Sequence, residues 1–296
     1  MLGGRQRRSQ IDAVSPILAQ IGQDAQALET SWNKIKTQID SLAILDMTDD
    51  PTSLSEAVRK STDNQALLSG IRDELDSVSG YQSKIDSSLQ DLKELELPSW
   101  SQEYVSLMQS MLAKDKERLG KTLQLVENAD RFYEFSENFA KGMLANTAMD
   151  QNLSDDRDKF EAKDYAGAAE AFRLALSQNL QVGTYTQDAK RIIPMTYLNK
   201  IEANRAEADA LIKKYLEIFG LINAGSYQEA NQAYQETDRA YDSLLSKMVT
   251  ASDATPENEA WLDAHIGSLG NELEQLTVEI ENLQNQAEAL IQQNTG

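Results

Sequence analysis

Apolar residues along much of the chain recur at alternating spacings of three and four, which is the heptad pattern of helices that pack in coiled coils and bundles. The first segment carries Ile11, Val14, Leu18, Ile21, Ala25, Leu28, Trp32, Ile35, Ile39 and Leu42 in this pattern. Ser15 and Pro16 are residue types favoured at a helix start, which would let the regular helix begin there and leave Ile11 and Val14 on a lead-in. The polar stretch 46–51 predicts the end of the segment.

Three further long helices are predicted from the same pattern. The second covers about 53–95, where only Gln82 interrupts the apolar seam, and Pro98 ends it. The third covers about 99–144 and has a broader apolar face, which predicts contact with more than one neighbour. The last covers about 256–293 and has leucine at every d position of its heptads.

Residues 149–251 differ from these helices, because their apolar stretches are shorter and tyrosines are frequent. Turn signals occur there at Gly183, Pro194, Gly220 and Gly225. We therefore predict an all-α fold, namely an elongated helical bundle or coiled coil of long heptad helices with a central helical-hairpin region. The predicted divisions are a basic N-terminal tail over 1–10, a long-helix bundle over 11–148, the central region over 149–251, and a C-terminal heptad helix over 252–296 that packs back on the bundle.

Charge and composition narrow the choice of partners and compartment. The formal net charge of −20 argues against a nucleic-acid partner, since proteins that bind phosphates need a basic surface. The absence of cysteine excludes disulfides and thiolate sites. No apolar run approaches the ~20 residues that cross a bilayer, and residues 1–10 carry three arginines without the apolar stretch of a signal peptide. A cytoplasmic location is the default expectation, and an extracytoplasmic one follows if a membrane anchor precedes those arginines.

Two blocks of the central region share a pattern of alanine and aromatic residues. DYAGAAEAFRLAL contains Tyr165, Ala168, Phe172 and Ala175, and GSYQEANQAYQET contains Tyr227, Ala230 and Tyr234 at matching offsets. These blocks resemble the second half of a tetratricopeptide repeat, in which alanines allow close helix approach and an aromatic residue fills the space between helices. The resemblance implies helical hairpins stacked into a surface that binds peptides or other proteins. A tight helix crossing built from alanine and tyrosine is the alternative interpretation.

Residues that could carry chemistry are sparse. The stretch 150–161 places oxygen-bearing side chains where a calcium-binding EF-hand loop has its ligands, but Asp155 and Arg157 replace the glycine and the apolar residue of that loop. A solvated loop that caps the next helix is therefore favoured. His265 is the only histidine, which excludes a histidine triad and any zinc site with two histidines, and we expect it to pack at a bundle edge. We predict no cofactor, no metal and no enzymatic activity.

These observations favour a non-enzymatic scaffold or adaptor that mediates protein–protein interaction through the central region. The alternative is an extracytoplasmic sensor or surface-receptor bundle whose anchor lies outside this chain. The final helix has no lysine or arginine, so parallel self-pairing of two copies through it is disfavoured. The first segment has the least repulsive charge, and we expect the first and last helices to lie against each other in one chain.

Overall fold

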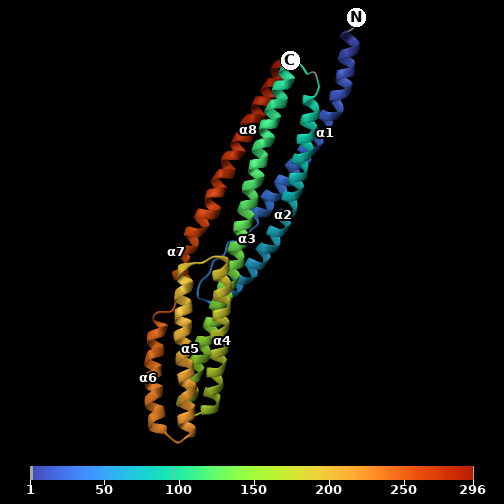
Figure 1. Cartoon of the computed structure of the whole chain (residues 1–296). Coiled ribbons are helices and arrows are strands. Elements are labelled where there is room, and N and C mark those ends of the chain that lie inside the picture. The colour runs from blue at the N-terminus through green and yellow to red at the C-terminus, as the bar shows by residue number, and fades with distance from the viewer. Residues whose placement is uncertain (1–2, 96, 296) are drawn as a thin grey trace. The chain divides into compact units, whose positions relative to one another are not determined.

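The computed structural model describes residues 3–95 and 97–295, and every regular element within these ranges is helical (Figure 1). The prediction of an all-α fold is therefore confirmed. The elements are α1 (Gly3–Asp40), α2 (Pro51–Lys93), α3 (Ser99–Glu161), α4 (Tyr165–Ile192), α5 (Thr196–Asn223), α6 (Tyr227–Leu245), α7 (Ala251–Leu262) and α8 (Ser268–Thr295), with a short π-helical turn η1 (Asp263–Gly267) between the last two.

The first helix starts earlier than its sequence suggests. Helix α1 begins at Gly3 and contains Pro16 in its interior, so residues 3–10 are helical and the predicted start at Ser15 is wrong. Val14 and Ile17, on either side of the proline, both pack against the same apolar core. Apolar packing on both sides of Pro16 stabilises one continuous helix. This packing compensates for the single backbone hydrogen bond that the proline removes.

The end of α3 and the start of α7 also differ from the predicted limits, because packing or capping extends each helix. Helix α3 continues past residue 144 to Glu161, because Met149 and Leu153 prolong its buried apolar stripe. Helix α7 begins at Ala251 rather than Pro256. Its start is fixed by a reciprocal pair of hydrogen bonds, in which the Thr250 backbone N–H donates to Asp253 Oδ2 at 2.9 Å and the Asp253 N–H donates to Thr250 Oγ1 at 3.1 Å. This is a capping box with aspartate at its last position.

Contacts divide the chain into two compact units, which are described separately. Unit 1 comprises residues 1–42, 66–129 and 262–296, and unit 2 comprises residues 43–65 and 130–261. The predicted boundary at 148/149 therefore falls inside α3 and inside unit 2. The reason is that Met149 and Leu153 belong to the core formed with α4, α5 and α6, so the end of α3 folds with the central region.

Unit 1 contains α1, most of α2, the first half of α3, and α8. Its main apolar cluster joins Ile21 of α1, Ile85 and Leu89 of α2, and Leu112 of α3. Helix α8 lies beside α3 (Figure 1), where Lys114 pairs with Glu279 at 2.8 Å. A second pair joins Lys121 and Glu272 at 2.5 Å. These pairs place the C-terminal helix on α3.

Unit 2 is built around α4, α5 and α6, which run side by side in Figure 1 with short connections.

Two of the turns in unit 2 have the same geometry. Lys163, after α3, and Gly225, after α5, both have positive φ, of 63° and 80°. In each turn the following N–H bonds back to a carbonyl five residues earlier, Asp164 to Lys159 and Ser226 to Leu221, both at 2.9 Å. This pattern is the Schellman motif that ends helices.

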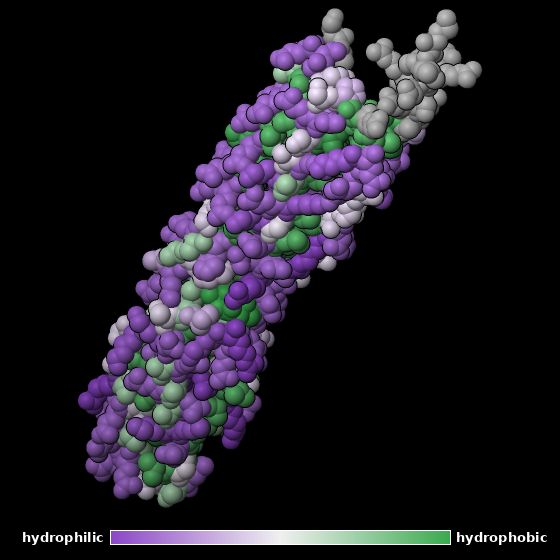
Figure 2. Space-filling model, turned by 45° about the horizontal axis from the view of Figure 1, so that its top comes forward, coloured by the Kyte–Doolittle hydropathy of each residue, from purple (hydrophilic) through white to green (hydrophobic). Residues whose placement is uncertain are grey.

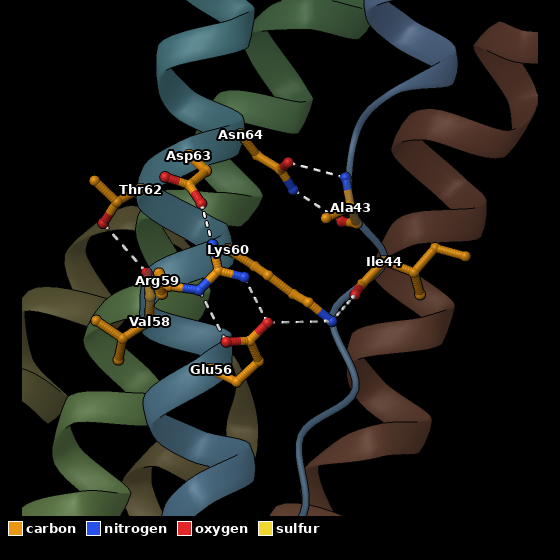
Figure 3. Close-up of polar contacts among 9 residues, drawn as sticks. All are labelled: Ala43, Ile44, Glu56, Val58, Arg59, Lys60, Thr62, Asp63 and Asn64. Carbon is orange, nitrogen blue, oxygen red and sulfur yellow. Dashed lines mark hydrogen bonds and ion pairs between the residues drawn. The ribbon is translucent and has the colours of Figure 1, made fainter.

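The chain between α1 and α2 is held against α2 by side chains (Figure 3). Asn64 accepts the Ala43 N–H at 2.9 Å and donates to the Ala43 carbonyl at 2.8 Å, so one amide satisfies both backbone groups. Lys60 lies 3.4 Å from the Ile44 carbonyl. Further along, the Asp49 carboxylate accepts the Ala251 N–H at 2.7 Å. These hydrogen bonds hold the connecting segment 43–50 in place within unit 2.

Candidate binding groove

Unit 1 contains a groove of about 620 Å³ lined mainly by α1, α3 and α8, which we call the α1–α3–α8 groove. Its lining spans Ala25–Asn33 on α1, Tyr104–Arg118 on α3 and Thr277–Ile291 on α8. On α8 the lining residues include Thr277, Ile280, Gln284, Ala287 and Ile291. Spacings of three and four place them on one face of the helix. Three helical faces therefore converge on one space.

Much of the groove lining is apolar. Leu112 and Ile85 are buried at its floor, whereas Trp32, Met108 and Met111 are only half-buried. Large aromatic and methionine side chains are enriched at protein interfaces, because they offer much apolar area and adapt their shape at low cost. In Figure 2 patches of hydrophobic residues reach the visible surface among hydrophilic ones.

A polar network anchors the lining at Asp115. Its carboxylate is buried and accepts hydrogen bonds from Gln82 Nε2 at 2.7 Å and from the Trp32 indole at 3.3 Å, and it also pairs with Arg118. The Arg118 guanidinium lies 3.9 Å from the Trp32 ring centroid, within cation–π range. Burial lowers the pKa of Arg118, and the Asp115 charge opposes that shift. The network fixes the orientation of Trp32, the largest side chain in the groove.

The rim of the groove is acidic. Glu29, Glu281 and Glu288 lie in its lining, and none forms an ion pair with a residue that the structure describes. The nearby lysines of α3 are already engaged, since Lys114 pairs with Glu279 and Lys116 pairs with Asp86 at 2.6 Å. Helix α8 itself contains no lysine or arginine. Negative charge therefore remains uncompensated along the opening.

The first and last helices, whose contact with each other stays a prediction, both line this groove. Both helices belong to unit 1, but stretch 25–33 of α1 and stretch 277–291 of α8 line a common space above α3. Ile280, Leu283 and Leu290 of the leucine-rich seam stay only half-buried.

The seven residues predicted for repeat-like packing all lie in unit 2, on α4 and α6. Those that are fully buried are Ala168, Phe172, Ala175 and Ala230. Tyr165 and Tyr234 are partly buried against the same core, and Tyr227 is 63% exposed. The Phe172 ring stacks on Tyr215 at 4.4 Å between centroids, and Tyr234 stacks on Phe160 at 3.8 Å.

The four predicted turn residues divide into two groups. Pro194 and Gly225 lie in connections, whereas Gly183 and Gly220 lie inside α4 and α5, so turns at those two positions are wrong. At Gly183 the absent side chain serves packing, because a Cβ there would lie 2.8 Å from Arg205 Cδ. Glycine thus leaves room for the Arg205 side chain of α5 rather than making a turn.

Sequence reasoning missed a buried acidic residue in unit 2. Asp156 of α3 is completely buried, and neither carboxylate oxygen forms a hydrogen bond within the described ranges. Burial raises the pKa of Asp156 to about 8, an effect that Lys159 and Arg157 oppose and that Asp238 reinforces. The Tyr234 hydroxyl is also buried without a partner among described residues. The carboxyl is therefore mostly protonated at neutral pH.

The solvated loop favoured for 150–161 and the calcium-loop interpretation are both wrong, because this stretch is helical up to Glu161. A helix spreads its side chains around the axis, whereas an EF-hand loop wraps them around an ion. Asp150 instead accepts a hydrogen bond from the Tyr241 hydroxyl at 2.7 Å. Across the described residues no group of three or more acidic or histidine side chains could hold a metal ion. The His265 side chain is exposed, and its backbone carbonyl accepts a hydrogen bond from Asn128 at 2.9 Å.

No helix in the described part of the chain has the length and apolarity that a membrane span requires. No protein-family model, curated protein sequence or solved structure matches the chain significantly. The fold itself defines the protein as an all-α helical-bundle protein, with the α1–α3–α8 groove as its candidate binding site.

Proposed function

We propose that this protein is a non-enzymatic scaffold or adaptor that binds another protein through the α1–α3–α8 groove. The observation that carries the proposal is the groove itself, since three helical faces leave half-buried Trp32, Met108 and Met111 open to a partner. An apolar opening rimmed by polar residues is typical of interaction sites. In this proposal the docking site lies in unit 1, in addition to any surface of the central region.

The tetratricopeptide resemblance of the central region is part of the same proposal. Two helix pairs, the end of α3 with α4 and α5 with α6, each turn through a Schellman motif, at Lys163 and Gly225. These turns are 62 residues apart, as are the two sequence blocks. The equivalent turns support the proposal that both helix pairs are versions of the same helical hairpin. In each pair one aromatic residue, Phe172 or Tyr234, fills the space between the helices.

A sensor or surface-receptor bundle is the second candidate, because the groove volume also lies within the range of ligand sites, roughly 300–1,000 Å³. The two candidates differ in what occupies the groove. A scaffold binds a protein segment there, and a sensor binds a small molecule. Neither proposal assigns a catalytic step to the chain.

Comparative capture from an extract of the source cells tests the scaffold function. The full chain is compared with a variant carrying Met108→Ala and Met111→Ala, and with a control carrying Leu123→Ala, which alters an exposed residue of the same helix outside the groove. Proteins retained by the wild type and the control but lost with the double variant support the function. Retention that is equal for all three chains refutes the groove as the docking site, and retention of no protein refutes the scaffold.

A further inference from the structure

We infer that the partner segment bound in the α1–α3–α8 groove is a basic amphipathic helix of about four turns. This inference rests on the proposed function and adds the chemistry of the partner. It is carried by three observations on the groove, namely its length, its acidic rim and its adaptable apolar lining.

The length of the groove fits a helix better than a compact ligand. Its lining on α3 runs from Tyr104 to Arg118, and that on α8 runs from Thr277 to Ile291. At 1.5 Å per residue each stretch is ~21 Å long, which is the length of about four helical turns. A helix laid in such a groove inserts side chains at i, i+3 or i+4, and i+7, matching the spacing of the lining.

The charge of the rim selects a basic partner. Glu281 and Glu288 lie on α8 and Glu29 on α1, so carboxylates border the opening on both of these helices. A helix with lysine or arginine beside its apolar stripe would place positive charge next to them, whereas an acidic helix would be repelled. The charge of −20 on this chain also disfavours a second copy as the occupant.

The apolar lining suits the side chains of such a helix. Met108 and Met111 can shift rotamers around an inserted leucine or phenylalanine, and Trp32 is held in place by Asp115 and Arg118. Trp32 thus offers a fixed contact for the bound helix, and the flexible methionines let the groove accept different apolar side chains.

The test uses the full chain and fluorescein-labelled peptides of about 18 residues, longer than the four turns that the groove accommodates. The first peptide has leucine at helical spacing and lysine at the flanking positions. A second has glutamate in place of each lysine, and a third has the composition of the first in an order that destroys the apolar stripe. Fluorescence anisotropy measures the dissociation constant of each, and competition with the apolar dye Nile red tests for a small-molecule site.

Charge-matched variants separate the groove from the general acidity of the chain. The pair Glu281→Gln and Glu288→Gln removes two negative charges from the rim. The control pair Asn282→Lys and Asn285→Lys changes the net charge equally on the same helix, at exposed positions outside the lining. Circular dichroism melting confirms that each variant is folded.

We expect the lysine peptide to bind at least tenfold more tightly than the other two, since opposite charge and a matching stripe both contribute. The rim variants should weaken it roughly fivefold more than the control pair, and Met108→Ala with Met111→Ala should weaken it further. Four results would each refute the inference that the partner is a basic helix. They are equal binding of all peptides, equal effects of both charge pairs, binding of Nile red alone, and dimerisation through the groove. If the extract experiment shows groove-dependent capture while the lysine peptide fails, the scaffold function stands and only the partner chemistry is wrong.

Discussion

Replacing Asp156 by asparagine should stabilise the protein at neutral and alkaline pH. The side chain is fully buried on α3, and its carboxylate finds no hydrogen-bond donor among the described residues. The charges of Lys159 and Arg157 compensate an ionised carboxylate in such a place only in part for its lost hydration. Asparagine keeps nearly the same shape and stays neutral at every pH.

The magnitude follows from the pKa. Burial raises the pKa of Asp156 from 3.8 to about 8 in the folded protein. Between these values the unfolded chain releases a proton that the folded protein retains, so the free energy of unfolding falls as the pH rises from about 4 to about 8, and then levels off. Four pKa units at ~1.4 kcal/mol each give up to roughly 6 kcal/mol, or about half of this where water reaches the ionised group.

Urea unfolding followed by circular dichroism at pH 5, 6, 7 and 8 measures the effect. The difference in unfolding free energy between Asp156→Asn and wild type should grow with pH, by as much as ~1.4 kcal/mol per unit. Asp155→Asn is the matched control, because Asp155 is the exposed neighbour on the same helix. If the Asp156→Asn difference is independent of pH, or if the control shows the same slope, the buried carboxyl does not titrate as described.

Three further substitutions test unit 2. Phe172→Ala should lower the free energy of unfolding by ~3 to 5 kcal/mol, because it empties the space beside Tyr215. Leu174→Ala, at an exposed position of α4, is the control and should cost under ~1 kcal/mol. Equal melting temperatures of the two variants would contradict this prediction. Glu257→Gln should cost about 1 to 2 kcal/mol in urea unfolding, because the Glu257 carboxylate accepts the first N–H of α5 at 2.6 Å, and Glu259→Gln serves as its control. Lys163→Gly should raise the melting temperature, gaining ~0.5 to 1 kcal/mol by relieving positive φ, and a lower value would refute the strain.

The heptad pattern identified the long helices well, because burial of one face dictates their register. Helix α2, predicted over 53–95, spans 51–93. The pattern also contained an unused signal, since Gln82 and Asp115 both occupy seam positions where apolar residues are expected. Two polar residues in facing seams predict a hydrogen bond, and the structure joins them at 2.7 Å. Pairs of this kind can fix the register of neighbouring helices.

The groove could not be predicted from periodicity. An apolar stripe indicates that a helix packs on another element, but it does not tell which helices border a groove. The outcome depends on how many helices the face of α3 accommodates, which is a property of the assembled unit 1. The burial of Asp156 likewise depends on α3 continuing beyond residue 144, where the sequence suggested a loop.

Methyl NMR of the full chain labelled at its methionines gives the most direct test of the α1–α3–α8 groove as a docking site. Met108 and Met111 line the groove, whereas Met143, Met149 and Met195 are buried in unit 2 and serve as internal controls. On titration with the lysine peptide, the two groove methyl signals should shift in proportion to the bound fraction, and the three control signals should stay in place. Shifts confined to unit 2, or no shift of Met108 and Met111 at saturating peptide, would contradict the account.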